Sequence, residues 1–123
     1  MTPIVEATRH LRTVVPQVLA TMDITQQEVR ELATEVFVHA VVLMHRVIHA
    51  RRCIFLLPHL VVTCVTLGCK LVIDDDMRVA TYRKVSRIPY LKDVTSLPTE
   101  LAQLEVDVMQ SLEYRLMSHL FPK

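Results

Sequence analysis

Two charged side chains lie where the helical pattern of the sequence predicts apolar ones. Lys70 comes near the end of an apolar segment, and Glu105 shares a helical face with Leu101 and Val108. A charge held against an apolar surface loses hydration unless it is paired and hydrogen-bonded. The sequence therefore offers a pairing of Lys70 with Glu105 across two packed helices. The alternative is that Lys70 extends to solvent and Glu105 lies at the edge of its apolar stripe.

The histidine and aspartate clusters are weaker candidates for chemistry. His45 and His49 are one helical turn apart, a spacing that can bind zinc, but no HExxH motif or convincing third ligand accompanies them. The run 74–76 of three aspartates lacks the glycine and distal glutamate of a calcium loop. With one glycine and no catalytic triad or P-loop, the chain offers no reaction centre. We therefore expect no enzyme, no cofactor and no metal.

Composition narrows the class of protein further. The chain has 123 residues, enough for one domain, and a net charge of +1 with 5% aromatic residues, which argues against binding nucleic acid. Hydrophobic residues make up 51%, which leaves surplus apolar surface for a partner. The three cysteines cannot all pair with one another, which indicates a reduced intracellular compartment, nucleus and/or cytoplasm. The first residues lack a basic segment followed by an apolar one, so we expect no signal peptide. Histidines and Lys70 break the apolar stretches, so we expect no membrane segment.

The residue pattern in the first half of the chain predicts two helices. Thr2 and Pro3 are a good helix start, and Pro16 should kink or end the helix that follows. Thr25 begins a capping-box pattern, and the apolar spacing beyond it predicts a second helix to about Ala50.

The second half predicts three more helices. Residues 57–73 are apolar almost all round, which is typical of a central helix, with Thr63 and Thr66 on a more polar side and Gly68 allowing close approach. The aspartates 74–76 should cap a short fourth helix that ends by Pro89, and Pro98 should open the last. The fold class is therefore all-α, a single five-helix bundle around the helix at about 57–73.

Two stretches resemble the cyclin box. Residues 64–71 look like its central helix, where small residues precede a signature lysine, and residues 104–116 resemble its fifth helix. The resemblance covers residues 36–118 well and the first 35 less fully. It implies a single cyclin-box domain over 1–123, with its core at about 25–118 and residues 1–24 flanking it or forming its first helix.

The chain is most similar to the single-box phosphate-starvation (P/U-type) cyclins. Their segment from the lysine to a Tyr-x-Lys-Val-Gly-Gly stretch aligns without a gap, although Ser86-Arg87 replace the two glycines and Val79 replaces a usual asparagine. The matching positions are Lys70, Asp74, Tyr82, Lys84 and Val85.

The resemblance implies a non-catalytic subunit that binds and activates a cyclin-dependent Ser/Thr protein kinase. In the family, the lysine and glutamate pair and present hydrogen bonds to backbone carbonyls at the start of the kinase C-helix. Lys70 and Glu105 would be these anchors, and Asp74 would lie near the activation-loop arginines unless it only caps a helix. Exposed neighbours on the third and fifth helices would add further contact: Thr66, Leu67, Ile73, Leu101 and Met109. The alternative is a helical adaptor or homo-oligomerising module, and self-association in the absence of a kinase is a further expectation.

Overall fold

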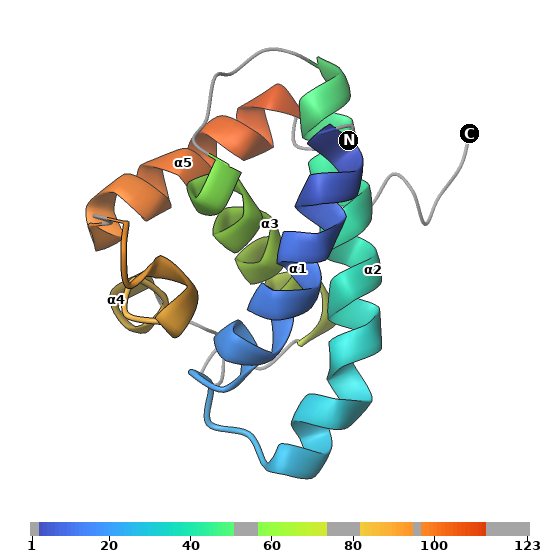
Figure 1. Ribbon diagram of the computed structural model, residues 1–123, viewed down its shortest axis with the longest axis vertical. Helices are drawn as coiled ribbons and strands as arrows, with labels where there is room; N and C mark the ends of the chain where they lie inside the picture. Colours follow the sequence, from blue (N-terminus) through green and yellow to red (C-terminus); the bar gives the residue numbers. More distant parts are fainter. Residues whose placement is uncertain (1–2, 51–56, 74–81, 95–96, 113–123) are drawn as a thin grey trace.

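The computed structural model describes residues 3–50, 57–73, 82–94 and 97–112, and these residues form helices and turns without a strand. The predicted all-α class is confirmed. The α-helices run in the order α1 (Pro3–Leu19), α2 (Gln26–Ala50), α3 (Leu57–Val72), α4 (Tyr82–Val85) and α5 (Pro98–Ser111), with a 3₁₀ helix η2 (Pro89–Leu91) between the last two (Figure 1).

Helix α3 lies at the centre of the bundle. It packs against α1, α2 and α5, which surround it in Figure 1. Every residue from Leu60 to Cys69 is buried. The apolar surface on all sides of this segment thus predicted its central place correctly, because each side of the helix meets another helix.

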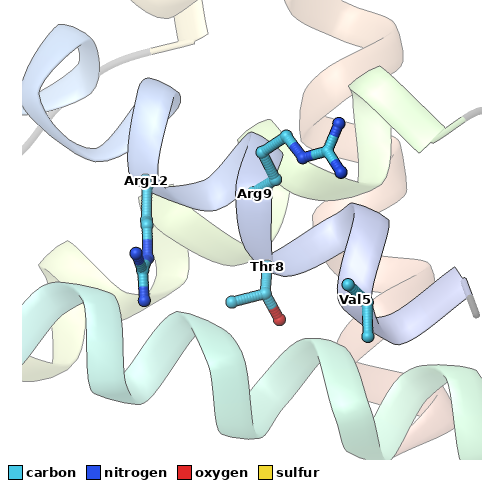
Figure 2. A pocket seen from close by; sticks show the side chains of 4 residues that line it. All are labelled: Val5, Thr8, Arg9 and Arg12. Carbon is cyan, nitrogen blue, oxygen red and sulfur yellow. The ribbon is translucent and has the colours of Figure 1, made fainter. Parts of the chain in front are cut away.

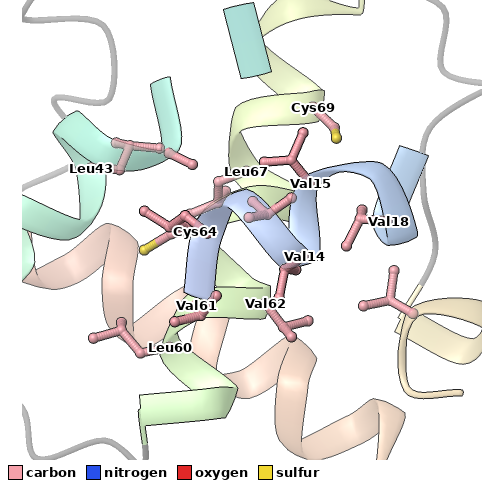
Figure 3. Close-up of a cluster of buried hydrophobic side chains, with 14 of the residues drawn as sticks. Val14, Val15, Val18, Leu43, Leu60, Val61, Val62, Cys64, Leu67 and Cys69 are labelled. Atoms are coloured by element: carbon pink, nitrogen blue, oxygen red, sulfur yellow. The ribbon is translucent and has the colours of Figure 1, made fainter. Parts of the chain in front are cut away.

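The core is built mainly from valine and leucine side chains on α1, α2 and α3. Figure 3 shows Val14 and Val18 of α1, Leu43 of α2, and Val61 and Val62 of α3 within one cluster of buried residues. A fully buried side chain of this size stabilises the fold by roughly 1.5–3 kcal/mol relative to exposure. This shared interior fixes the position of α3, and with it the position of Lys70.

Gly68 allows α2 and α3 to approach each other closely. A Cβ atom at Gly68 would lie 3.1 Å from the Val36 carbonyl oxygen and 3.5 Å from the Ala40 amide nitrogen. These are backbone atoms of α2, so they yield less readily than the end of a flexible side chain. The predicted close approach at this glycine is confirmed.

The start of α2 follows the capping box that the sequence predicts. The Glu28 amide donates to Thr25 Oγ1 at 3.1 Å, and the Thr25 amide donates to Glu28 Oε1 at 3.2 Å. Each side chain thereby satisfies one backbone donor that the first helical turn leaves unpaired.

Two helices end near a proline, α1 after Pro16 and α4 before Pro89. Helix α1 does not end at Pro16 but continues to Leu19, and the Pro16 carbonyl still accepts from the Ala20 amide at 2.9 Å. A proline in the last helical turn removes only one donor, which the packing of Val18 and Leu19 in the core outweighs. Helix α4 ends at Val85, before Pro89, which instead opens η2. The predicted cap at 74–76 lies outside the described residues.

Thr63 and Thr66 do not lie on a polar side of α3, as the sequence pattern predicted. Both are completely buried. Their hydroxyls donate to the carbonyls of His59 and Val62, at 2.8 and 2.9 Å. A threonine hydroxyl paired with its own helix in this way no longer needs water, so the residue packs as an apolar one.

One segment of the described chain, Gln26–His49, is long and apolar enough to cross a membrane by length and composition. One such helix is weak evidence for a membrane span, so the expectation of no membrane segment stays a prediction. A core helix of a soluble bundle passes the same test, and α2 packs against both α1 and α3.

Candidate partner-binding site at Lys70 and Glu105

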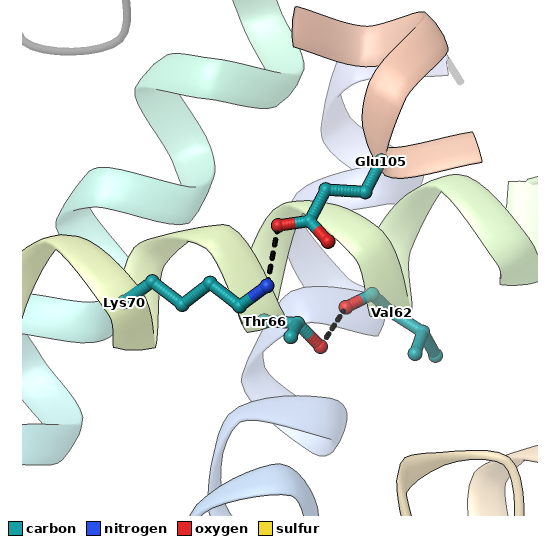
Figure 4. Close-up of polar contacts among 4 residues, drawn as sticks. All are labelled: Val62, Thr66, Lys70 and Glu105. Carbon is teal, nitrogen blue, oxygen red and sulfur yellow. Dashed lines mark hydrogen bonds and ion pairs between the residues drawn. The ribbon is translucent and has the colours of Figure 1, made fainter. Parts of the chain in front are cut away.

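The predicted pairing of Lys70 with Glu105 is present in the structure. Lys70 Nζ lies 2.6 Å from Glu105 Oε1, so the pair joins the last turn of α3 to the middle of α5. Figure 4 shows the two side chains pointing toward one another. Helices α3 and α5 pack against each other, which brings the two side chains together. Of the two interpretations that the sequence left open, the structure adopts the ion pair.

The two members of the pair differ in exposure. The Lys70 side chain is 36% exposed, whereas the Glu105 side chain is 13% exposed. Leu101 and Val108, which lie one turn before and after Glu105, are buried. The carboxylate is therefore shielded on the apolar side of α5 and depends on Lys70 for compensation, while the ammonium still reaches solvent.

Tyr82 of α4 adds an aromatic ring to this pair. Lys70 Nζ lies 5.4 Å from the centre of the ring, within the range of a cation–π contact. The Tyr82 hydroxyl is buried beside Glu105. Burial raises its pKa above the ordinary value, and the negative charge of Glu105 and a side-chain hydrogen bond to Glu105 raise it further. Sequence reasoning noted Tyr82 only as a matching position, because helical spacing does not reveal which ring lies under a distant lysine.

An apolar strip flanks Glu105 on the outer side of α5. Ala102 comes three residues before Glu105, and Val106 and Met109 come one and four residues after it, so the four residues share one side of the helix. Val106 is 41% exposed, Ala102 is exposed and Met109 is half-buried. The sequence analysis named Met109 but missed Val106. Val106 comes directly after Glu105 and falls outside the buried stripe of Leu101 and Val108, and this position could have indicated its exposure.

Four residues predicted to contact the kinase are buried inside the chain: Thr66, Leu67, Ile73 and Leu101. Thr66, Leu67 and Leu101 are 0%, 2% and 1% exposed, so the expectation that they lie on exposed sides of their helices is wrong. The physical reason is that α1, α2 and α5 cover α3 on several sides. Ile73 is 8% exposed, and Asp74 lies outside the described residues.

The other candidate groups do not form a second centre. In the parts of the chain that the structure describes, no three His, Cys, Asp or Glu side chains gather to hold a metal ion. Cys64 and Cys69 are free and buried, and burial raises the pKa of each thiol to about 12.

A separate hollow of about 360 Å³ lies on α1. Its lining residues are Val5, Thr8, Arg9 and Arg12. Figure 2 shows the Arg9 side chain directed away from that of Arg12, so the two guanidinium groups do not converge on one point. The Arg12 guanidinium lies 5.7 Å from the centre of the Phe37 ring on α2.

Within the described residues, a helical bundle carries a lysine–glutamate pair between its central helix α3 and helix α5. The family model for the cyclin N-terminal domain matches residues 5–117, and the chain belongs to this family. Cyclin domains are regulatory and non-catalytic. Searches of curated proteins and of solved structures found no match to the chain.

Proposed function

We propose that this cyclin binds a cyclin-dependent Ser/Thr kinase and activates it by docking on the kinase C-helix. The observation that carries the proposal is the ion pair of 2.6 Å between Lys70 and Glu105, held at the surface where α3 meets α5. An exposed apolar residue, Val106, lies beside it.

The chemistry of Lys70 suits the recognition of a helix start. An ammonium group carries three N–H donors, and Glu105 takes one of them. The side chain is 36% exposed, so the remaining donors can reach backbone carbonyl oxygens of a partner. Because Glu105 already holds the ammonium in place, less side-chain conformational entropy is lost when a partner binds.

Activation follows from preference for one kinase conformation. Val106, Met109 and the Lys70 donors form a rigid surface on packed helices, and this surface fits a C-helix only in the inward position. A ligand shifts a conformational equilibrium by its difference in affinity for the two states. Binding of the inward state therefore assembles the kinase active site without any catalytic group from this chain.

Charge reversal at either anchor tests the proposal. Lys70→Glu and Glu105→Lys should each weaken binding to purified cyclin-dependent kinases by more than about 30-fold, since each breaks a shielded charge pair. Glu35→Lys and Lys92→Glu reverse exposed charges on α2 and after η2 and should bind as the unmodified chain does. Isothermal titration measures the affinity, and far-ultraviolet circular dichroism checks the fold. Unchanged kinase binding by both anchor variants would refute the proposal.

The swapped double variant Lys70→Glu/Glu105→Lys separates recognition from simple support. It restores attraction between α3 and α5, so a merely structural pair would be rescued. It also puts a carboxylate, which donates no hydrogen bond, at position 70. We expect stability to recover and kinase binding to stay lost.

Two finer assignments belong to the same proposal. We place the chain in the phosphate-starvation (P/U-type) branch, which Tyr82, Lys84 and Val85 support, and inside the cell, in the nucleus and/or cytoplasm.

Self-association is the alternative function. Two exposed apolar side chains favour it, because Val5 is 54% exposed and Val38 is 51% exposed. Sedimentation distinguishes the two, because a stable homodimer that ignores kinases supports the alternative.

A further inference from the structure

Three cations gather on the outer side of α4 and of the turn that follows it. Arg83, Lys84 and Arg87 are all exposed. The residues of this segment that face the bundle are buried and recur every three positions: Tyr82, Val85 and Ile88. The three cations therefore lie on the side that faces away from the bundle, and α4 lies at the edge of the bundle in Figure 1. We call these three residues the α4 cation cluster.

The charge of this segment differs from that of the whole chain. Residues 82–94 contain four lysines and arginines and one acidic residue, a net charge of +3, whereas the whole chain carries +1. Within the described part of the chain, no cation of the cluster makes an ion pair. Protein surfaces usually intersperse both signs, because like charges held close together repel. An anionic partner would therefore relieve repulsion in the cluster as well as add attraction.

The backbone that carries the cluster is already ordered. The Arg87 amide donates to the Lys84 carbonyl at 3.1 Å, and this bond closes the turn after α4. Further along, the Tyr90 amide donates to Gln17 Oε1 at 2.8 Å, which ties the segment to α1. A partner thus meets cations on a fixed backbone, and binding costs mainly the entropy of their side chains.

The surroundings of the cluster favour an acidic peptide over other polyanions. Single-stranded nucleic acid usually stacks its bases on exposed rings, but Tyr82 is buried, and Tyr90 is half-buried with its hydroxyl bonded to His10. Proteins that lie on membranes insert apolar side chains beside their cations. The large exposed apolar residues of the described chain lie outside residues 82–94: Val5, Val38, Leu97 and Val106.

We propose that Arg83, Lys84 and Arg87 form a docking surface for an acidic peptide segment of a partner protein. Each arginine can hold a carboxylate through two parallel N–H donors, and the lysine ammonium adds a third positive charge. None of the three belongs to the Lys70–Glu105 pair. The inference therefore goes beyond the proposed kinase binding and does not depend on it.

A fluorescein-labelled hexapeptide of glutamate and aspartate tests the surface, with a hexapeptide of glutamine as the neutral control. Fluorescence anisotropy should show binding of the acidic peptide alone at about 20 mM salt. Binding should weaken at least about fivefold at about 150 mM salt, because exposed charges are then screened. In ¹H–¹⁵N spectra, the amides that shift should be those of residues 83–88.

Charge reversal locates the binding on the cluster. Arg87→Glu should weaken peptide binding by roughly tenfold, because it removes an attraction and adds a repulsion. Arg83→Glu is a second variant with the same expectation. Arg30→Glu reverses an exposed arginine on α2 and changes the net charge equally, so it should bind within about twofold of the unmodified chain. Equal weakening by Arg87→Glu and Arg30→Glu would reduce the effect to net charge and overturn the inference.

Three further results would also overturn it. Tighter binding of a thymidine hexanucleotide, or of phosphatidylcholine vesicles that contain phosphatidylserine, would assign the cluster to a nucleic acid or a membrane. Absence of peptide binding, with kinase affinity lost in Arg87→Glu, would assign it to the kinase interface and leave the kinase-binding proposal standing. Peptide binding by a chain that binds no kinase would support this inference and refute the other proposal.

Discussion

Lys70 and Glu105 are separated by 35 positions in the sequence, yet their charged atoms are 2.6 Å apart. The relationship is asymmetric, because Glu105 is 13% exposed and Lys70 is 36% exposed. Removing either partner leaves the other unpaired, and the cost depends on whether the remaining charge can reach water.

We therefore predict unequal effects on stability. Lys70→Met leaves the shielded carboxylate alone and should lower the free energy of unfolding by about 1–2 kcal/mol. Glu105→Gln leaves an ammonium that can turn to water and should cost about 0.5–1 kcal/mol. Urea unfolding of both variants and of the double variant gives the coupling between them. Equal losses, or a coupling near zero, would contradict the asymmetry.

The sequence predicted the Lys70–Glu105 pair because each charge is out of place among its own apolar neighbours in the sequence. A lysine at the end of an apolar helix and a glutamate within the stripe of Leu101 and Val108 each need compensation. Periodicity also predicted α2, α3 and α5, because their apolar residues recur at helical spacing and their starts carry Thr25 or proline.

What the sequence did not predict depends on contacts between distant segments. The burial of Thr66 follows from hydroxyl bonding to Val62 and from the helices around α3. Whether Val106 is exposed depends on which helices leave that side of α5 free. The position of the Tyr82 ring against Lys70 depends on how α4 packs on α5. Propensity and spacing carry none of this information.

Gly68 provides a test of the packing between α2 and α3. Gly68→Val should lower the free energy of unfolding by about 2–3 kcal/mol, because a branched side chain would press on the Val36 carbonyl oxygen, 3.1 Å from the first added atom. Gly68→Ala should cost less, since alanine favours the helix by about 1 kcal/mol over glycine. Urea unfolding measures both, with the exposed Ala102→Val as control for a branched residue in a helix. A stabilised Gly68→Val would show that α2 moves away freely.

The two buried cysteines should react slowly with thiol reagents in the folded chain. Burial raises the pKa of the Cys64 and Cys69 thiols to about 12, so almost no thiolate forms at neutral pH. Both should react with iodoacetamide at least about 100-fold more slowly in the native chain than in urea, because the thiolate is the reactive form. Mass spectrometry of peptides assigns the reaction to each site. Rapid labelling of either cysteine under native conditions would show that α3 opens readily.

The same thiols make stability depend on alkaline pH. Their folded pKa lies above the ordinary value of 9.0, so the folded state holds its protons more tightly than the unfolded state. This stabilisation is complete below about pH 9 and is lost as pH rises from 9 towards 12, by at most about 1.4 kcal/mol per pH unit for each thiol. Denaturation at a series of pH values measures the slope, and Cys64→Ala/Cys69→Ala should make it shallower.

Substitutions at Thr25 measure how much the N-cap of helix α2 contributes to the free energy of unfolding. Thr25→Ala removes the oxygen that accepts from the Glu28 amide at 3.1 Å and should lower the free energy of unfolding by about 1 kcal/mol. Thr25→Ser keeps that oxygen and should stay within about 0.3 kcal/mol of the unmodified chain, since serine caps at least as well. Kinase binding by both variants should be unchanged at a temperature where they are folded, because Thr25 precedes α2 while Lys70 and Glu105 lie on α3 and α5. If Thr25→Ala weakened binding without changing stability, α2 would have to be counted among the elements that position the site.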